Sequence, residues 1–235
     1  MKDLVDMKYN AALTFLLSFV LFSVTSAQSS KKVAYGILFD NTGSMRQLIP
    51  RQHEIAGVVL KQLKNGSNVS VYGFAGASLD SPFSKFATGL ECSTDMAAVK
   101  KQIDEIGVVG GQTTLIDAIQ SAVERLKNPV AQQCGKSDEQ ILIVMSDGED
   151  RASTAKPDDL MKFAKESGVK LYVIGLVEEL SSESGFLGKS PSKKAKEFLS
   201  RIAAESGGRI VFPKKRENAD EIVTRLFSEN YVLPK

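Results

Sequence analysis

The chain has 235 residues, of which 43% are hydrophobic and 25% are charged, a composition typical of a globular protein with a substantial core. Its 30 Lys and Arg residues nearly balance 28 Asp and Glu residues, and the basic residues are scattered along the sequence. This pattern does not favour nucleic acid as a partner, because nucleic-acid binding requires a basic patch or stripe. The length predicts a single domain.

The N-terminal segment has the layout of a secretory signal peptide. An uncharged apolar stretch, residues 11–25, follows Lys2 and Lys8, and small residues end at Ala27. The stretch is shorter than the roughly 20 residues that a membrane span needs. We therefore expect cleavage near Ala27, a secreted or periplasmic protein, a linker over residues 28–32, and no membrane insertion of the mature chain. An uncleaved membrane anchor is the alternative.

From residue 33 onward, apolar runs alternate with helical patterns. Strands are expected at residues 33–39, 68–74, 84–89, 140–145, 169–177 and 209–212. Helices are expected at residues 50–63, 96–106, 113–126, 157–167, 195–203 and 222–227, with Ser93 or Thr94 capping the second of them.

This alternation predicts a doubly wound α/β domain over residues 33–230, followed by a short tail at residues 231–235. Its central sheet is expected to be mostly parallel with helices on both faces, and residues 84–89 form one antiparallel edge strand. The long segment 178–192 leaves a strand at the sheet edge where ligands bind in such folds.

Three polar segments fall at strand ends or helix starts. They are residues 40–44 (DNTGS), 110–113 (GGQT) and 146–148 (SDG). The carboxyl ends of parallel strands meet at one edge, so the segments are expected to deliver hard oxygen atoms to one point, as Mg²⁺ requires. The oxygen-bearing side chains concerned are Asp40, Thr42, Ser44, Thr113 and Asp147.

In order and spacing, these segments resemble the metal-ion-dependent adhesion site of von Willebrand factor A domains, and the resemblance covers about residues 31–230. It implies the Rossmann-like fold of that family. It also implies that Thr42 and Ser44 coordinate the ion through their hydroxyls, and that Thr113 does so directly when a ligand is engaged and through water otherwise. Asp40 and Asp147 would hold the ion's waters or coordinate it directly in some states. Mg²⁺ is the expected ion, with Mn²⁺ or Ca²⁺ as alternatives.

The resemblance further implies a function in binding and not in catalysis. In this family, a Glu or Asp carboxylate of a partner protein fills the open coordination position. If the two carboxylates hold the ion only through its waters, the three neutral hydroxyls leave it with residual positive charge, which attracts an external acid. One rival hypothesis is a phosphatase-like, Mg²⁺-dependent enzyme with Asp40 as nucleophile, although it leaves residues 110–113 unexplained. Another is a structural domain with a vestigial metal site.

The predicted topology also suggests a disulfide bond. Cys92 follows the antiparallel strand, and Cys134 follows the helix that starts near Thr113, so both are expected at the edge opposite the metal site. An exported protein permits such a bond, and adjacent helices at one edge can bring two Cα atoms within about 7 Å. We therefore predict a Cys92–Cys134 bridge.

Overall fold

The computed structural model describes the chain except residues 1–30, 64–65, 77–84, 129–135, 181–189 and 234–235. Residues from Lys32 onward form one compact unit. None of the helices in this described part combines the length and apolarity that crossing a membrane requires.

The unit is built on a six-stranded sheet in the order β3-β2-β1-β4-β5-β6. The strands are β1 Val33–Asp40, β2 Asn68–Ala75, β3 Lys85–Ser93, β4 Glu139–Ser146, β5 Lys170–Gly175 and β6 Arg209–Val211. All neighbouring pairs are parallel except β2 and β3, which are antiparallel. The mostly parallel sheet with one antiparallel edge strand is therefore confirmed.

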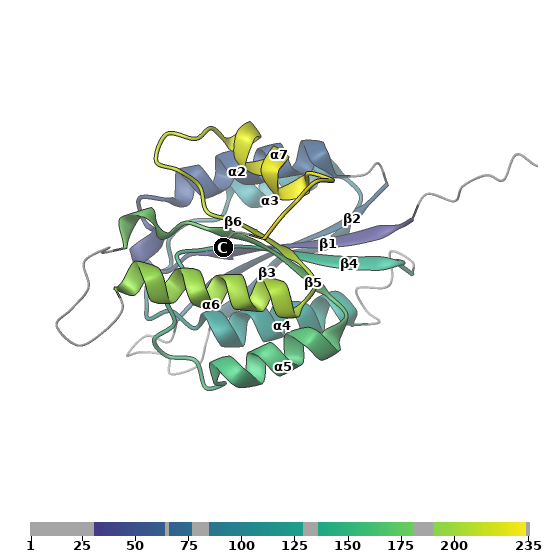
Figure 1. Ribbon diagram of the computed structural model, residues 1–235. Helices are drawn as coiled ribbons and strands as arrows, with labels where there is room; N and C mark the ends of the chain where they lie inside the picture. Colours follow the sequence, from purple (N-terminus) through teal and green to yellow (C-terminus); the bar gives the residue numbers. More distant parts are fainter. Residues whose placement is uncertain (1–30, 64–65, 77–84, 129–135, 181–189, 234–235) are drawn as a thin grey trace, which may run out of the picture. The chain divides into compact units, whose positions relative to one another are not determined.

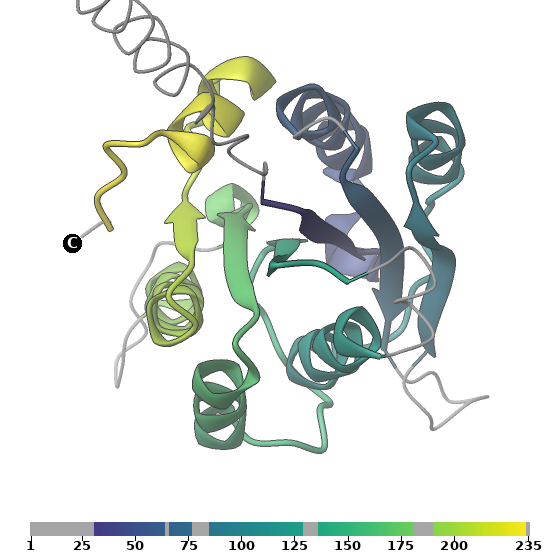
Figure 2. The ribbon, with the colours of Figure 1, turned by 90° about the vertical axis from the view of Figure 1, so that its right-hand side faces the viewer.

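Helices cover both faces of the sheet (Figures 1 and 2). One face carries α2 Ile49–Gln62, α3 Met96–Asp104 and α7 Ala219–Phe227. The other carries α4 Leu115–Lys127, α5 Pro157–Ser167 and α6 Pro191–Glu205. Two short 3-10 helices, η1 Gly43–Met45 and η3 Val177–Glu179, follow β1 and β5.

The packing of the central strand β1 on both faces of the sheet explains why its sequence has no polar residue before Asp40. Its side chains alternate between the faces: Ile37 and Phe39 pack into the core under α2 and α7, whereas Leu38 packs into the core under α4. All three are fully buried. Each such side chain contributes about 1.5–3 kcal/mol through burial, so the strand is held from both sides and its C-terminal end is fixed.

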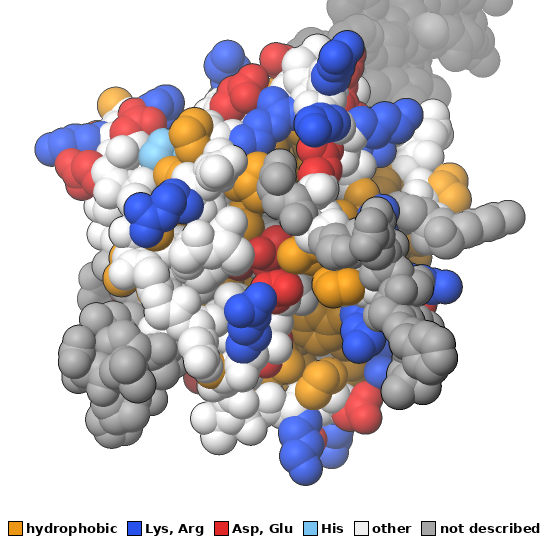
Figure 3. All heavy atoms as spheres, turned by 90° about the vertical axis from the view of Figure 1, so that its left-hand side faces the viewer, with side chains coloured by type: hydrophobic (Ala, Val, Ile, Leu, Met, Phe, Trp, Pro, Cys, Tyr) orange, Lys and Arg blue, Asp and Glu red, His pale blue; other side chains and the backbone are white. Residues whose placement is uncertain are grey.

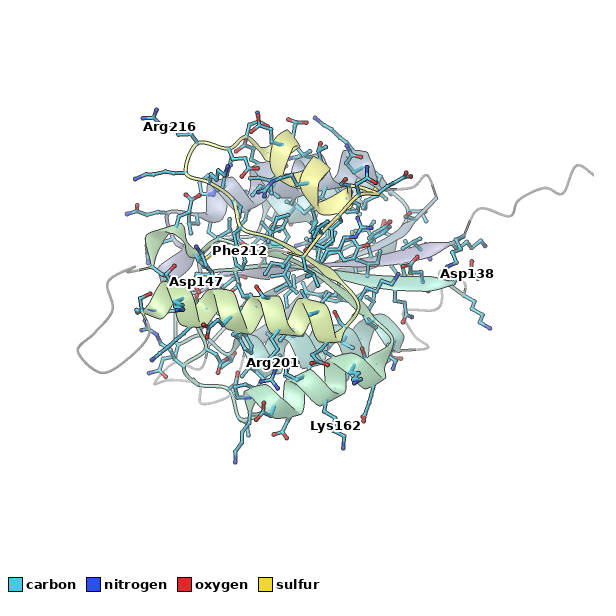
Figure 4. The ribbon with its side chains drawn as sticks, viewed as in Figure 1. Asp138, Asp147, Lys162, Arg201, Phe212 and Arg216 are labelled. Carbon is cyan, nitrogen blue, oxygen red and sulfur yellow. The ribbon has the colours of Figure 1, made fainter. Side chains whose placement is uncertain are left out.

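The register of β1 and β4 brings two of the polar segments to one level. Phe39 pairs with Met145, so Asp40 and Ser146 come next on adjacent strands. Asp138 and Asp147, which flank β4, lie at opposite edges of the sheet (Figure 4). The side of the sheet where the parallel strands end, which holds Asp147, is called the metal edge below.

Several expected boundaries differ from the structure. One is the end of β5, which lies at Gly175 and not at residue 177, because Val177 begins η3. Strand β3 continues to Ser93, beyond the expected end at residue 89, because it stays paired with β2 through two irregularities in register. Ser93 therefore belongs to a strand, and the cap of α3 is Asp95, whose carboxylate accepts hydrogen bonds from the Ala97 and Ala98 amides. Neither Ser93 nor Thr94 caps this helix. In the long segment 178–192, residues 181–189 lie outside the described part.

Candidate metal centre

The first polar segment folds back on the carboxylate of Asp40. This side chain is fully buried, and its Oδ1 accepts hydrogen bonds from the Thr42 amide (3.1 Å) and from the Thr42 hydroxyl (2.6 Å). The turn of η1 then brings the Ser44 hydroxyl to 3.2 Å from that of Thr42. From α2, the Gln52 side-chain amide donates to the backbone carbonyl of Asp40 (2.9 Å). Three of the expected ligands are thus gathered at the end of β1.

Ser146 connects this segment to the adjacent strand. Its hydroxyl donates to Oδ2 of Asp40 over 2.7 Å and accepts a hydrogen bond from the Gly148 amide (3.0 Å). Both oxygens of Asp40 are therefore bonded within the protein. The sequence placed Ser146 in the third polar segment but gave it no role, since its partner is distant in sequence.

Asp147 lies beside the first segment. Its side chain is 3% exposed, and its Oδ1 accepts a hydrogen bond from the Glu149 amide (2.9 Å). The Ser44 hydroxyl also lies near enough to the Asp147 carboxylate to lower its pKa. Asp40, Thr42, Ser44 and Asp147 consequently form one continuous cluster at the metal edge.

The electrostatics of this cluster favour a cation. Burial, and then the nearby Asp147 carboxylate, raise the pKa of Asp40 from 3.8 to about 7, although the hydroxyls of Thr42 and Ser146 oppose the rise. Burial also raises the pKa of Asp147, against the hydrogen bond from the Glu149 amide and the nearby Ser44 hydroxyl. Both shifts report negative charge that water and protein groups solvate poorly. A bound divalent ion would relieve this cost directly.

Thr113 reaches the same edge through backbone hydrogen bonds. The Asn41 carbonyl accepts from the amides of Val109 (3.0 Å) and Gly110 (3.4 Å), which ties this loop to the end of β1. The Thr113 carbonyl accepts from the amides of Arg151 (2.9 Å) and Ala152 (3.0 Å), which ties it to the loop after β4. The Thr113 side chain is 3% exposed. The structure thus brings the three polar segments together.

Asn41 is the second residue of the site to which the sequence gave no role. It is buried. Its backbone amide donates to the Phe74 carbonyl (3.0 Å), and its side-chain Oδ1 accepts a hydrogen bond from the Phe74 backbone amide (3.1 Å). Its side chain lies so close to Gly73 that a Cβ there would come within 2.9 Å of the Asn41 amide nitrogen. Asn41 therefore holds the first segment against β2 while its carbonyl holds the loop that carries Thr113.

The loop after β4 is fixed against the start of α4 by a third set of bonds. Asp150 accepts hydrogen bonds from the Ile116 amide (3.1 Å) and from the Ser153 hydroxyl (2.6 Å). Asp117 in turn accepts from the amides of Thr154 (2.8 Å) and Ala155 (3.0 Å). Asp150 thus provides an acceptor for a backbone amide in the first turn of α4. From the sequence alone, this residue is expected to be a solvated loop or cap residue.

The residues present fit a divalent cation with a preference for oxygen ligands. The donors are two buried carboxylates and three hydroxyls, and none is a softer nitrogen or sulfur atom. Within the described residues, no Lys or Arg forms an ion pair with Asp40 or Asp147. A group of three or more acidic, His or Cys residues that could hold a metal is also absent from this part, so any ion here depends on the hydroxyls.

The predicted disulfide partners lie elsewhere. Cys92 is near the end of β3, level with the beginning of β2 and so away from the metal edge, as expected. Its backbone has a positive φ of 55°, and its amide donates to the Ser70 hydroxyl (3.0 Å). Cys134 lies outside the described residues, so the Cys92–Cys134 bridge stays a prediction.

Solved structures share this fold at low sequence identity. One is proximal thread matrix protein 1 from the mussel byssus with a zinc-occupied MIDAS motif (19% identity, 83% of this chain and 46% of that chain, TM-score 0.60). Another is manganese-loaded Plasmodium vivax TRAP protein (16% identity, 83% and 72%, TM-score 0.55). A third is a von Willebrand factor type A structure from Catenulispora acidiphila (18% identity, 83% and 41%, TM-score 0.57).

At these identities the likeness concerns the fold alone. The chain spans less than half the length of the mussel and Catenulispora acidiphila structures that it matches. No curated protein matches the chain at a significant level.

A family model decides the classification. The model of the von Willebrand factor type A domain matches residues 36–225, which include all three polar segments. Domains of this family are typically metal-dependent adhesion or protein-binding modules and are usually non-catalytic. The chain therefore belongs to the von Willebrand factor type A domain family.

Proposed function

We propose that this domain binds a divalent cation through Asp40, Thr42, Ser44, Thr113 and Asp147, and that the ion captures a Glu or Asp carboxylate of a partner protein. Mg²⁺ is the proposed ion, with Mn²⁺ or Ca²⁺ as alternatives. The observation that carries the proposal is the cluster of two buried carboxylates and bonded hydroxyls at the metal edge. An ion among these groups would be bound by protein oxygens on its inner side.

The exposure of the donors supports a ligand that approaches from solvent. Asp40, Thr42, Thr113 and Asp147 are buried, whereas Ser44 is exposed. Mg²⁺ binds near-octahedrally and usually keeps several waters, so the solvent side of the ion would carry exchangeable positions. An external carboxylate that replaces one of these waters would complete the shell and neutralise remaining charge.

The surroundings of Asp40 disfavour the phosphatase-like alternative. A nucleophilic carboxylate must present one free oxygen to a substrate phosphorus atom. Here Oδ1 is bonded to Thr42 and Oδ2 to Ser146, and the side chain is fully buried. We therefore assign Asp40 a role in holding the ion and not in chemistry.

The place of action is part of the same proposal. The apolar residues 11–25, with small residues ending at Ala27, suggest export and removal of the leader. We accordingly propose that the domain meets its partner outside the cytoplasm, in a secreted or periplasmic setting. Mass determination of the N-terminus of the mature protein from its source tests this proposal, with a start near Gln28 as the expected result.

Calorimetric titration tests the metal-binding proposal. The purified protein should bind Mg²⁺ with a stoichiometry near one, and Asp147→Asn and Thr113→Val should each weaken or abolish binding. Asp138→Asn is the matched control, since Asp138 flanks the same strand at the opposite edge (Figure 4). Equal affinity in all four proteins, or no heat with Mg²⁺, Mn²⁺ or Ca²⁺, would show that the site is vestigial or lies elsewhere.

A further inference from the structure

An apolar hollow lies beside the metal edge, between the beginnings of three helices. Its volume is about 410 Å³. The apolar side chains that line it come from α4, α5 and α6, and they are Ile116, Pro157, Pro191, Ala195 and Phe198. Figure 3, which faces the metal edge, shows hydrophobic side chains sunk below the surface next to acidic ones. A hollow of this size accommodates a large apolar side chain.

The hollow and the metal site share one loop. Gly148 and Glu149 line the hollow, and they directly follow Asp147. Gly148 has a positive φ of 81°, and a Cβ there would come within 2.8 Å of Leu199 and 3.1 Å of Ala195. The absence of a side chain at residue 148 therefore lets α6 approach the loop closely. A partner segment whose carboxylate reaches the ion can therefore place a nearby residue at the hollow.

Two basic residues, Arg151 and Lys194, and two acidic residues, Glu149 and Asp150, also line the hollow. Arg151 pairs with Glu149 over 2.6 Å, and the exposed Lys194 lies on the first turns of α6. Because these charges balance, the positive charge that favours an acidic segment of a partner over a basic one would come from a divalent ion at the metal edge. The floor of the hollow, in contrast, is apolar, so an apolar side chain of the partner can be buried against it.

Resting on the proposed function, we propose that the hollow receives a large apolar side chain that lies a few residues from the metal-binding Glu or Asp in the partner protein. The carboxylate is the same for every acidic ligand, so it cannot by itself distinguish partners. The apolar anchor can, because burying a Leu, Ile, Met or Phe side chain strengthens binding by about 10- to 100-fold. The hollow would therefore determine which acidic segments the domain selects.

The test uses a displayed peptide library in which one central Glu is fixed and the flanking positions are randomised. Peptides retained by the purified protein in Mg²⁺ and released by chelator are sequenced. We expect enrichment of large apolar residues at one fixed distance from the Glu. Synthetic peptides with and without that residue should differ in affinity by about 10- to 100-fold.

Two variants test whether the hollow is responsible for this preference for apolar residues. Phe198→Ala removes part of its wall, and Pro191→Glu places a charge at its rim in the first turn of a helix, where Glu is well tolerated. Both should lose the apolar preference while Mg²⁺ binding and Glu-dependent capture persist. Phe163→Ala is the matched control, since Phe163 is a partly buried residue of α5 outside the described lining.

The outcomes separate this inference from the proposed function. Glu-dependent capture with no apolar preference, or with a preference that both variants retain, overturns the inference and leaves the proposed function standing. Loss of the preference in Phe163→Ala as well would show a general effect on folding, and would also overturn it. Absence of any Mg²⁺-dependent capture of Glu peptides removes the proposed function, and the inference with it.

Discussion

Ser146 donates its hydroxyl hydrogen to Oδ2 of Asp40 over 2.7 Å, and this bond joins the ends of the two central parallel strands. The bond occupies the oxygen of Asp40 that Thr42 does not contact. It therefore sets the orientation of the carboxylate before any ion arrives. Removing a group that orients a metal-holding side chain typically weakens metal affinity by about 10- to 100-fold.

Ser146→Ala should weaken Mg²⁺ binding by about 10- to 100-fold, because the Asp40 carboxylate loses its partner on one side. The metal-free protein should also lose about 1–3 kcal/mol of unfolding free energy, the cost of a buried acceptor left unpaired. Calorimetry and urea unfolding measure the two effects. Ser167→Ala at the end of α5 is the control and should leave Mg²⁺ affinity unchanged. Unaltered affinity in Ser146→Ala would remove the orienting role.

Asn41 and Gly73 should show coupled effects on stability. Asn41→Ala removes the acceptor of the Phe74 amide, at a cost of about 1–3 kcal/mol. Gly73→Ala should destabilise the wild type because its Cβ meets the Asn41 side chain at 2.9 Å, and it should cost much less in the Asn41→Ala background. Urea unfolding of the four proteins measures the coupling. Strictly additive changes would mean that the two residues do not press on each other.

The stability of the metal-free protein should fall as pH rises from about 4 to about 7. The folded protein holds a proton on Asp40 up to about pH 7, whereas the unfolded chain releases it near 3.8, so the folded state binds more protons in this window. The slope contributed by this group is at most about 1.4 kcal/mol per pH unit. Asp40→Asn should flatten the profile, measured by urea unfolding in chelator.

Added Mg²⁺ provides the control for this pH dependence. An ion that binds the ionised carboxylates should stabilise the folded protein progressively more as pH rises towards 8, since protons then compete less with the ion. A profile in chelator that is identical for wild type and Asp40→Asn would contradict the raised pKa of Asp40.

Thiol counting tests the Cys92–Cys134 bridge. The denatured, unreduced protein should show no free thiol, since these are the two cysteines of the chain. Replacing both by Ser should lower the unfolding free energy by about 3–4 kcal/mol, because the bridge closes a loop of about 40 residues in the unfolded state. Two free thiols in protein isolated from its source would rule the bridge out.

Strong local patterns made most of the fold predictable. The uninterrupted apolar runs that became β1 and β4 indicated central strands, and helix ends such as Gly168, with a φ of 74°, were marked by their residue type. The end of β3 was misplaced because its length depends on pairing with β2, which local sequence does not report. That error also moved the expected cap of α3 from Asp95 to its neighbours.

The sequence predicted which residues gather at the candidate site, but not the hydrogen bonds that hold them in place. Asp40, Thr42 and Ser44 form a short local pattern, and topology alone predicts that Asp147 reaches the same edge. Ser146 and Asn41 act through Asp40 and Phe74, which are 106 and 33 residues away. Such partners become visible only when the register of the strands is known.

Diffraction from crystals grown with Mn²⁺ can locate the bound ion directly, since anomalous scattering identifies the metal without assumptions about its ligands. A metal site at this edge predicts one strong peak within coordination distance of the Thr42 and Ser44 hydroxyls, with Asp40, Thr113 and Asp147 around it. Crystals that contain Mn²⁺ but show no peak at this edge of the sheet, or show it elsewhere, would contradict the proposed site.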